Sequence, residues 1–410
     1  MSRTSITYIA AAVGVLTLLF LGVWFVFLRS PAQQEGAATS GFGLGDSRSV
    51  ALPESSSAAD ENDATPIPSQ QQSGESVFKI SDGPVAAATL VQTSHPTTTI
   101  ARYALQTNGH VFDLVLDSAG AVPRAISNTT IPGGVRGIWP QQGGALVLQY
   151  LDGAIVKSVS LAFPTTTTSG SPVRIQFLPD NIIGIAASPD GQSIAYLMPS
   201  SAGTDAYVAR PDGSNAKKLF SLAFKELLLS WPSPATLLLS TKSAAGVPGA
   251  VFSVNAATGG VVPLLYASGL TATADRSFAH IVYQNSVGGQ ARTYAHATKG
   301  GADTAVSFNP IPEKCAWSPA ATSTMYCAMP PSSVPVDYLD SWHKGAASLA
   351  DSIFTYDFST GGSRLVTTPG SDGGTPSDIA ELAVSPDERY LVFIKKGDRS
   401  LWGVRLGDSQ

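Results

Sequence analysis

The sequence predicts an all-β protein whose main domain is a β-propeller, on three observations. From Ser76 onward, short strand-like runs are separated by Gly, Asp, Pro and Ser turns, and no long amphipathic helical pattern appears. Turn signals at the ends of successive inner strands recur at intervals of about 43–49 residues between Trp139 and Trp317. An apolar content of 43% with only 13% charged residues indicates a well-buried, β-rich body.

The clearest repeat unit is the stretch from Ser188 to Phe220. It opens with Ser188, Pro189, Asp190 and Gly191, a turn in which proline presets φ, aspartate bonds the following backbone and glycine accepts a positive φ. Two further strands and a second Pro-Asp-Gly turn follow. Together with Ile182–Ala187 this makes four short strands in about 45 residues, the size of one propeller blade.

These turns resemble the repeat of TolB-like, WD-repeat-like β-propellers, in which the inner strand of a blade ends in Ser-Pro-Asp-Gly. The match covers 188–220 well and 385–406 in part, where Ser385, Pro386 and Asp387 are followed by Glu388 in place of glycine. The resemblance implies a propeller fold and an exported, partner-binding style of protein. It implies no catalytic residue, because the motif is a turn.

Seven blades are the preferred count. Six turn signals mark inner-strand ends, and residues 84–132 fit one earlier, degenerate blade. The last blade lacks one strand, and Val77–Ser81 is the expected donor, since closing the ring with an N-terminal strand removes an exposed edge. Six or eight blades and a two-domain β-sandwich arrangement are the alternatives.

The first 75 residues predict a membrane anchor followed by a linker. Ile6–Leu28 is a 23-residue run without charge, roughly 35 Å long as a helix and thus long enough for a bilayer core of ~30 Å. The alternative, a cleaved signal peptide, needs a shorter apolar region. A signal-anchor over residues 6–28 places residues 1–5 in the cytoplasm and the C-terminal domain outside it, in the periplasm or at the cell surface.

Residues 29–75 predict a disordered linker rich in Ser, Ala, Gln and Pro. Within 31–75, seven acidic residues stand against Arg48 alone, a net charge of −6. Such a composition buries too little apolar surface to offset the entropy of the chain. Because the whole chain carries −5, no global basic field is present to attract nucleic acid.

The two cysteines predict a disulfide. If Pro319–Ser323 forms a hairpin turn, Cys315 and Cys327 lie directly opposite one another on neighbouring strands, as do Trp317 and Met325. The alternative is a pair of buried reduced thiols. An exported domain favours the bridge, with a structural role.

Residues 330–350 interrupt the repeat between the second and third strands of a blade. This insertion should emerge on the face opposite the Ser-Pro-Asp-Gly turns, where blades are linked. Aromatic and charged residues crowded in a loop are typical of partner contacts; the alternative is a loop that covers the ring, with Tyr338 and Trp342 as packing. The candidate binding residues are Asp337, Tyr338, Asp340, Trp342, His343 and Lys344.

The sequence predicts no cofactor and no metal. The five histidines show no tight metal-ligand spacing, and no serine-hydrolase elbow, P-loop or dinucleotide-binding glycine motif occurs. The favoured function is therefore a membrane-anchored, extracytoplasmic propeller that binds or scaffolds another envelope protein. The alternative is a propeller enzyme, a hydrolase or lyase possibly acting on glycans, with its site at the central channel.

Overall fold

A computed structural model describes residues 77–407, apart from 95–96, 165–172, 288–289, 307–308, 331–336 and 371–376. The N-terminal segment 1–5, the anchor predicted at 6–28 and the linker predicted at 29–75 lie outside the described residues, as does part of the 330–350 insertion. None of the helices within the described ranges is long and apolar enough to cross a membrane.

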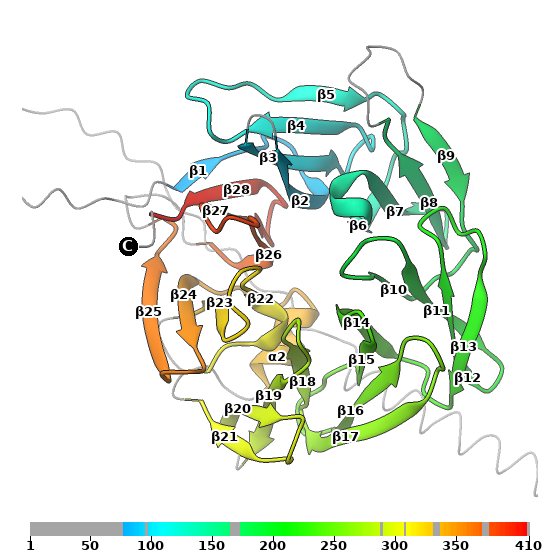
Figure 1. Ribbon diagram of the computed structural model, residues 1–410, viewed down its shortest axis with the longest axis vertical. Helices are drawn as coiled ribbons and strands as arrows, with labels where there is room; N and C mark the ends of the chain where they lie inside the picture. Colours follow the sequence, from blue (N-terminus) through cyan, green and yellow to red (C-terminus); the bar gives the residue numbers. More distant parts are fainter. Residues whose placement is uncertain are drawn as a thin grey trace, which may run out of the picture. The chain divides into compact units, whose positions relative to one another are not determined.

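The described strands form seven four-stranded antiparallel sheets arranged around a ring (Figure 1). The first strand of each sheet lies nearest the centre, and the fourth lies at the rim. The seven-bladed propeller is therefore confirmed. The alternatives of six blades, eight blades or two β-sandwich domains are excluded by the number and arrangement of these sheets.

Blades 1–4 follow one another along the chain (Figure 1). Blade 1 contains β2 (Val85–Ser94), β3 (Thr97–Leu105), β4 (Val111–Val115) and β5 (Arg124–Ser127). Blade 2 contains β6 (Gly134–Ile138), β7 (Ala145–Asp152), β8 (Ile155–Ala162) and β9 (Arg174–Phe177), with the short helix η1 (Gln141–Gly143) after β6. Blade 3 contains β10 (Gly184–Ala187), β11 (Ile194–Ser200), β12 (Gly203–Ala209) and β13 (Lys217–Leu222). Blade 4 contains β14 (Leu227–Ser233), β15 (Thr236–Thr241), β16 (Pro248–Asn255) and β17 (Val261–Ser268).

Blades 5–7 complete the ring. Blade 5 contains β18 (Thr271–Ala274), β19 (His280–Val287), β20 (Gln290–Ala297) and β21 (Asp303–Ala305). Blade 6 begins with η2 (Pro312–Lys314) and contains β22 (Cys315–Trp317), β23 (Thr324–Met329), β24 (Ser352–Asp357) and β25 (Gly362–Thr367), with helix α2 (Tyr338–His343) between β23 and β24. Blade 7 contains β26 (Ile379–Val384), β27 (Tyr390–Lys395), β28 (Leu401–Arg405) and β1 (Val77–Lys79).

The ring closes where β1 pairs with β28, as predicted. Val77 lies opposite Val404, and Lys79 lies opposite Trp402. The N–H groups of the next two residues, Ile80 and Ser81, both donate to the carbonyl of Leu401. The N-terminal strand thus supplies the outer strand of blade 7 and covers an edge that β28 would otherwise expose.

The hydrophobic core lies between blades. Each pair of neighbouring blades shares a cluster of buried apolar side chains, contributed by the facing surfaces of the two sheets. At the closure, for example, Tyr103 of blade 1 and Val392 of blade 7 belong to one cluster, with Phe78 of β1 packed against it. Burial of these side chains from both sides makes each sheet depend on its two neighbours.

Two faces of the ring are distinguished by their loops. The turn face carries the loops that join first to second strands, including Ser188–Gly191 and Ser385–Asp387. The link face carries the loops that join second to third strands, the links between blades, and α2. The insertion therefore emerges opposite the Ser-Pro-Asp-Gly turns, as the strand order predicted.

The closure generates a first prediction, at Gly403 of β28. A Cβ atom there would lie 2.5 Å from the ring of Phe78 on β1. We expect Gly403→Ala to lower the free energy of unfolding, measured in urea, by about 1–3 kcal/mol. In the double variant with Phe78→Ala, the loss should be smaller than the sum of the two single losses, because the clash is gone.

Gly397→Ala is the matched control, since nothing lies within 4 Å of the added Cβ atom. Strictly additive losses from Gly403→Ala and Phe78→Ala would show that the two residues do not meet at the closure.

Candidate functional site

The Ser-Pro-Asp-Gly turn of blade 3 is held by its own side chains. Ser188 Oγ donates to Asp190 Oδ1 over 2.5 Å, and the same carboxylate oxygen accepts the Gln192 N–H at 3.0 Å. Gly191 has a φ of 69°, and a Cβ atom on it would lie 2.2 Å from the backbone nitrogen of Gln141 in blade 2. The turn therefore needs glycine both for its conformation and for its approach to the neighbouring blade.

Blade 7 repeats this turn with a departure at Glu388. Ser385 Oγ donates to Asp387 Oδ1 over 2.6 Å, as in blade 3. Glu388 takes the glycine position with a φ of 54°, and its carboxylate accepts a hydrogen bond from Ser318 Oγ of blade 6. The substituted residue thus reaches a neighbouring blade with its side chain, where glycine would do so with its backbone.

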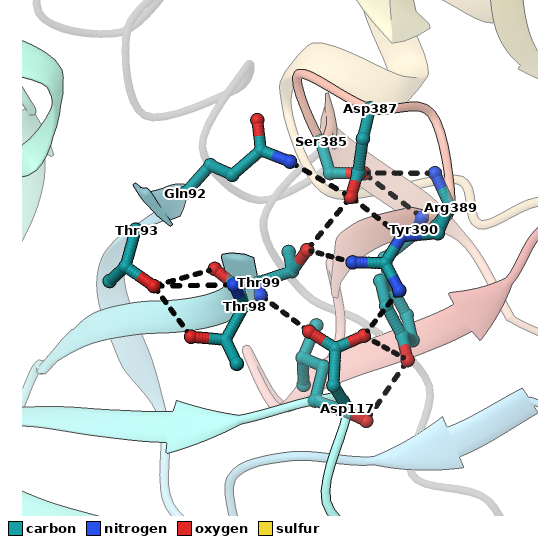
Figure 2. A network of polar contacts seen from close by, with 10 residues as sticks. Gln92, Thr93, Thr98, Thr99, Asp117, Ser385, Asp387, Arg389 and Tyr390 are labelled. Carbon is teal, nitrogen blue, oxygen red and sulfur yellow. Dashed lines mark hydrogen bonds and ion pairs between the residues drawn. The ribbon is translucent and has the colours of Figure 1, made fainter. Parts of the chain in front are cut away.

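Asp387 is also the centre of a polar network that joins blade 7 to blade 1 (Figure 2). Arg389 Nε donates to Asp387 Oδ2 over 2.7 Å, and Arg389 Nη1 lies 2.8 Å from Asp117 Oδ1. Asp387 Oδ2 also accepts bonds from Gln92 Nε2 and Thr99 Oγ1 of blade 1. One guanidinium therefore bridges two carboxylates that come from the two blades adjoining the closure.

The charge of Asp387 is stabilised by these bonds. Burial by itself raises the pKa of this carboxyl group, but the bonds from Ser385 and Arg389 outweigh it and lower the pKa to about 2. The turn residues predicted from the sequence are accordingly structural, since they order the turn face and hold neighbouring blades together.

On the link face, α2 packs with its apolar side inward. Leu339 and Trp342 are 5% and 7% exposed and form a cluster with Ile311, against which Tyr338 packs. Trp342 Nε1 donates to both carboxylate oxygens of Asp378, at 2.9 and 3.0 Å. These aromatic residues therefore serve as packing, the alternative reading of the insertion.

The polar candidates of the insertion divide into bonded and exposed residues. Asp340 Oδ1 accepts the N–H of Ala245 in blade 4, and His343 Nε2 lies 2.9 Å from Glu313 Oε2. Asp337 and Lys344 are exposed at the two ends of α2. A role of these residues in binding a partner stays a prediction.

A buried ionic cluster lies beneath α2, and no sequence pattern indicated it. Lys314 of η2 is fully buried, and its Nζ donates to Asp351 Oδ2 and, over 2.9 Å, to Asp378 Oδ1. The side chains of Asp351 and Asp378 are 0% and 4% exposed. Lys396 Nζ donates to the carbonyl of Trp342 and lies 3.9 Å from the centre of its ring.

Burial dominates the electrostatics of this cluster. It raises the pKa of Asp351 even though Lys314 and the N–H of Ile379 act in the opposite direction. It also lowers the pKa of Lys396, against the attraction of Asp378. Among the described residues, Asp351 Oδ1 and the hydroxyl of Tyr338 are buried without a hydrogen-bond partner. Such atoms are uncommon in folded proteins and call for an explanation.

A partly exposed pair, Glu313 and His343, lies beside this cluster. The side chains are 24% and 21% exposed, and Glu313 also accepts a hydrogen bond from Thr271. Glu313 lines a cavity of about 220 Å³ formed by β14 and β15 of blade 4, β18 of blade 5 and the start of blade 6, and Leu228 and Leu238 are among its apolar lining residues. A carboxylate that orients an imidazole is one arrangement used for proton transfer.

The inner strands are otherwise nearly neutral. Across the seven first strands, only Arg136 of β6 and Glu381 of β26 are charged. Arg136 donates to Gln149 Oε1 and to the carbonyl of Ile183, while Glu381 accepts from Arg399. Both are therefore engaged by neighbours in the wall of the ring.

The predicted disulfide is present. Cys315 on β22 lies directly opposite Cys327 on β23, as Trp317 does opposite Met325, and the two sulfur atoms are bonded. Cys327 is buried in the cluster between blades 5 and 6. The bridge is structural, because it fixes the inner hairpin of blade 6.

The histidines of blade 5 are each paired with an aspartate. His280 Nδ1 lies 3.0 Å from Asp275 Oδ2, and His296 Nδ1 lies 2.9 Å from Asp303 Oδ1. Within the described ranges, no three His, Cys, Asp or Glu side chains are grouped so that they could hold a metal ion.

Comparison with known proteins supports the fold. An oligogalacturonate lyase from Vibrio parahaemolyticus superimposes with a TM-score of 0.57 at 9% identity, covering 82% of this chain and 95% of that one. An oligogalacturonate lyase in complex with manganese gives 0.56 at 11% identity, covering 82% and 95%. TolB from Acinetobacter baumannii gives 0.40 at 13% identity, covering 79% and 80%.

No protein-family model matches the sequence, and no curated protein matches it either. At 9% and 11% identity, the two oligogalacturonate lyases show a shared fold and nothing finer. The TolB-like character of the turns remains a resemblance.

The Asp387 network generates a pH prediction. The pKa of the Asp387 carboxyl group is about 2 in the folded state and ordinarily 3.8. The charge of Asp387 therefore stabilises the fold above about pH 4, and this stabilisation is lost as the pH falls toward 2. We expect Asp387→Asn to lower the free energy of unfolding at pH 7 by about 1–2 kcal/mol.

The difference between Asp387→Asn and the unchanged protein should shrink as pH falls from 4 to 2 in urea titrations. Asp82→Asn is the control, since Asp82 is fully exposed and its loss should change stability by less than about 0.5 kcal/mol. A difference that persists unchanged at pH 2 would contradict the role of this charge.

Proposed function

We propose that this chain is a membrane-anchored, extracytoplasmic β-propeller that binds a protein partner of the cell envelope. The apolar run Ile6–Leu28 supports the anchor, and the bonded pair Cys315–Cys327 supports an oxidising compartment. The acidic segment 31–75 would act as a tether, since its 45 residues would reach roughly 35–40 Å from end to end as a flexible chain.

The observation that carries the binding function is the number of exposed apolar side chains on blade 2. Twelve large apolar side chains of the described residues are exposed, and five of them belong to this blade. Single exposed apolar residues are ordinary, but a concentration of them marks contact sites. The five are Val135, Leu151, Ile155, Ile175 and Phe177.

The rim strand β9 carries two of these five side chains. All four of its residues are exposed, including Ile175 at 47% and Phe177 at 64%. These two alternate along the strand and share one face, opposite Leu161 and Val159 of β8. β9 is the last strand of its sheet, so its outer edge offers backbone groups to an extended segment of a partner.

Two aromatic residues on outer strands provide a matched experiment. A photo-crosslinking amino acid at Phe177 should capture the partner on intact cells, whereas the same group at Tyr266 on β17, 70% exposed, should not. Ile175→Asp should reduce capture from position 177 by about tenfold or more, because a charge would be buried in an apolar contact.

A third crosslinking position, Lys344, tests the exposed end of α2. Capture at Lys344 with no capture at Phe177 would show that the partner binds the link face and not blade 2. Equal capture at Phe177 and Tyr266, insensitive to Ile175→Asp, would contradict a specific contact on blade 2.

A second candidate function is an enzyme that acts on glycans at the central channel. The pair Glu313–His343 favours it, and so does the similarity of the fold to that of an oligogalacturonate lyase. It predicts formation of unsaturated products from oligogalacturonate, measured by ultraviolet absorbance. His343→Gln should then reduce the rate by about 100-fold or more. No product from oligogalacturonate, or a rate unchanged in His343→Gln, would count against this candidate.

A further inference from the structure

The ionic cluster beneath α2 contains the parts of an amide-forming site. We propose that Lys314 and Asp351 become joined by an intramolecular isopeptide bond between Lys314 Nζ and Asp351 Cγ, formed by the folded chain itself with Asp378 transferring the protons. This inference is independent of the partner or activity proposed above.

The amine and the carboxyl group already touch. Lys314 Nζ donates to Asp351 Oδ2, and it lies 2.9 Å from Asp378 Oδ1. Lys314 and Asp351 are each only 1% exposed, so the two groups are held together away from solvent. Fixing reactants in contact replaces an encounter in solution and strongly accelerates bond formation.

Asp351 is arranged as an electrophile. The Ile379 N–H donates to Asp351 Oδ2 over 2.7 Å, which polarises the carbonyl and would stabilise negative charge on that oxygen. The other oxygen, Oδ1, has no partner among the described residues. Burial raises the pKa of Asp351, which favours the protonated acid, and an acid rather than a carboxylate accepts an amine.

The step balances without another reactant. Transfer of one ammonium proton of Lys314 to Asp351 gives a neutral amine and a carboxylic acid. The amine attacks Asp351 Cγ, and Asp378 accepts the proton released from nitrogen. Asp378 returns that proton to Oδ1, which leaves as water while the C–N bond remains. No oxidation or reduction takes place.

Trp342 of α2 positions Asp378 and closes the site. Its Nε1 donates to both Asp378 oxygens, and its ring lies 5.2 Å from Lys314 Nζ. Ile311 and Leu339 complete an apolar cover. After the bond has formed, the charge of Asp378 is still attracted by the ammonium of Lys396, which lies 3.9 Å from the centre of the same ring.

The product would tie η2 to the start of β24, across a sequence separation of 37 residues. This loop contains the disulfide, the inner hairpin of blade 6 and the whole insertion. A covalent link there would hold α2 over the link face even if its non-covalent contacts opened.

Mass spectrometry of the full-length protein tests the bond directly. We expect an intact mass lower by one water than that of the disulfide-bonded linear sequence. Because succinimide formation at Asp-Gly sites also releases one water, the tryptic peptides are needed to distinguish the two products. A bonded Lys314 resists trypsin, so after reduction residues 300–344 should appear as one peptide, branched to 345–364.

Two variants test the assignment of roles. Lys314→Arg keeps the positive charge but lacks a primary amine, and its digest should contain only linear peptides. Asp378→Asn keeps an acceptor for Trp342 Nε1 and should lower the bonded fraction at least tenfold. Retention of the Cys315–Cys327 bridge and of the circular dichroism spectrum shows that each variant is folded.

Separate peptides 300–314 and 315–344 from the unchanged protein would overturn the proposal. A branch from Lys314 to Asp378 would overturn the assigned pair, and full bonding in Asp378→Asn would overturn the role of Asp378.

Discussion

The pairing of β1 with β28 is the constraint on which the rest of the ring depends. Without it, blade 7 would have three strands and an open edge, and the cluster between blades 7 and 1 would lose Phe78 and Ile80. Joining segments more than 300 residues apart carries an entropic cost, but this cost grows only slowly with loop length. Shared burial at the closure and the Arg389 bridge between Asp387 and Asp117 offset it.

The sequence predicted the ring because its determinants are local and repeated. Each turn on the turn face uses residues whose conformational preferences do not depend on the rest of the fold. The spacing of the turns therefore predicted the number of blades. The register of Cys315 and Cys327 followed from one hairpin for the same reason. Glu388 was visible as a departure from glycine, but its bond to Ser318 of blade 6 depends on packing between blades, which no local pattern encodes.

The buried cluster was missed because its members meet only in the folded ring. Lys314, Asp351 and Asp378 stand at the beginnings of β22, β24 and β26, three strands that all start on the link face. In the sequence each reads as an ordinary solvated charge beside a strand. For the same reason the sequence left Trp342 open between a contact residue and a packing residue; in the fold its indole N–H donates to Asp378.

The apolar packing between blades differs from one interface of the ring to the next. Between blades 3 and 4, ten buried residues form one shared cluster. Between blades 5 and 6 the buried residues divide into two clusters of three, one with Val282, Met325 and Cys327 and one with Ala295, Val306 and Tyr356. A smaller apolar cluster contributes less to cohesion. It is in this part of the ring that the disulfide, the stacking of Phe358 on Trp317 and His280, and the cover of α2 over Lys314 are found. At this interface the disulfide and the stacked rings add to two small apolar clusters, so covalent and aromatic contacts supplement burial there.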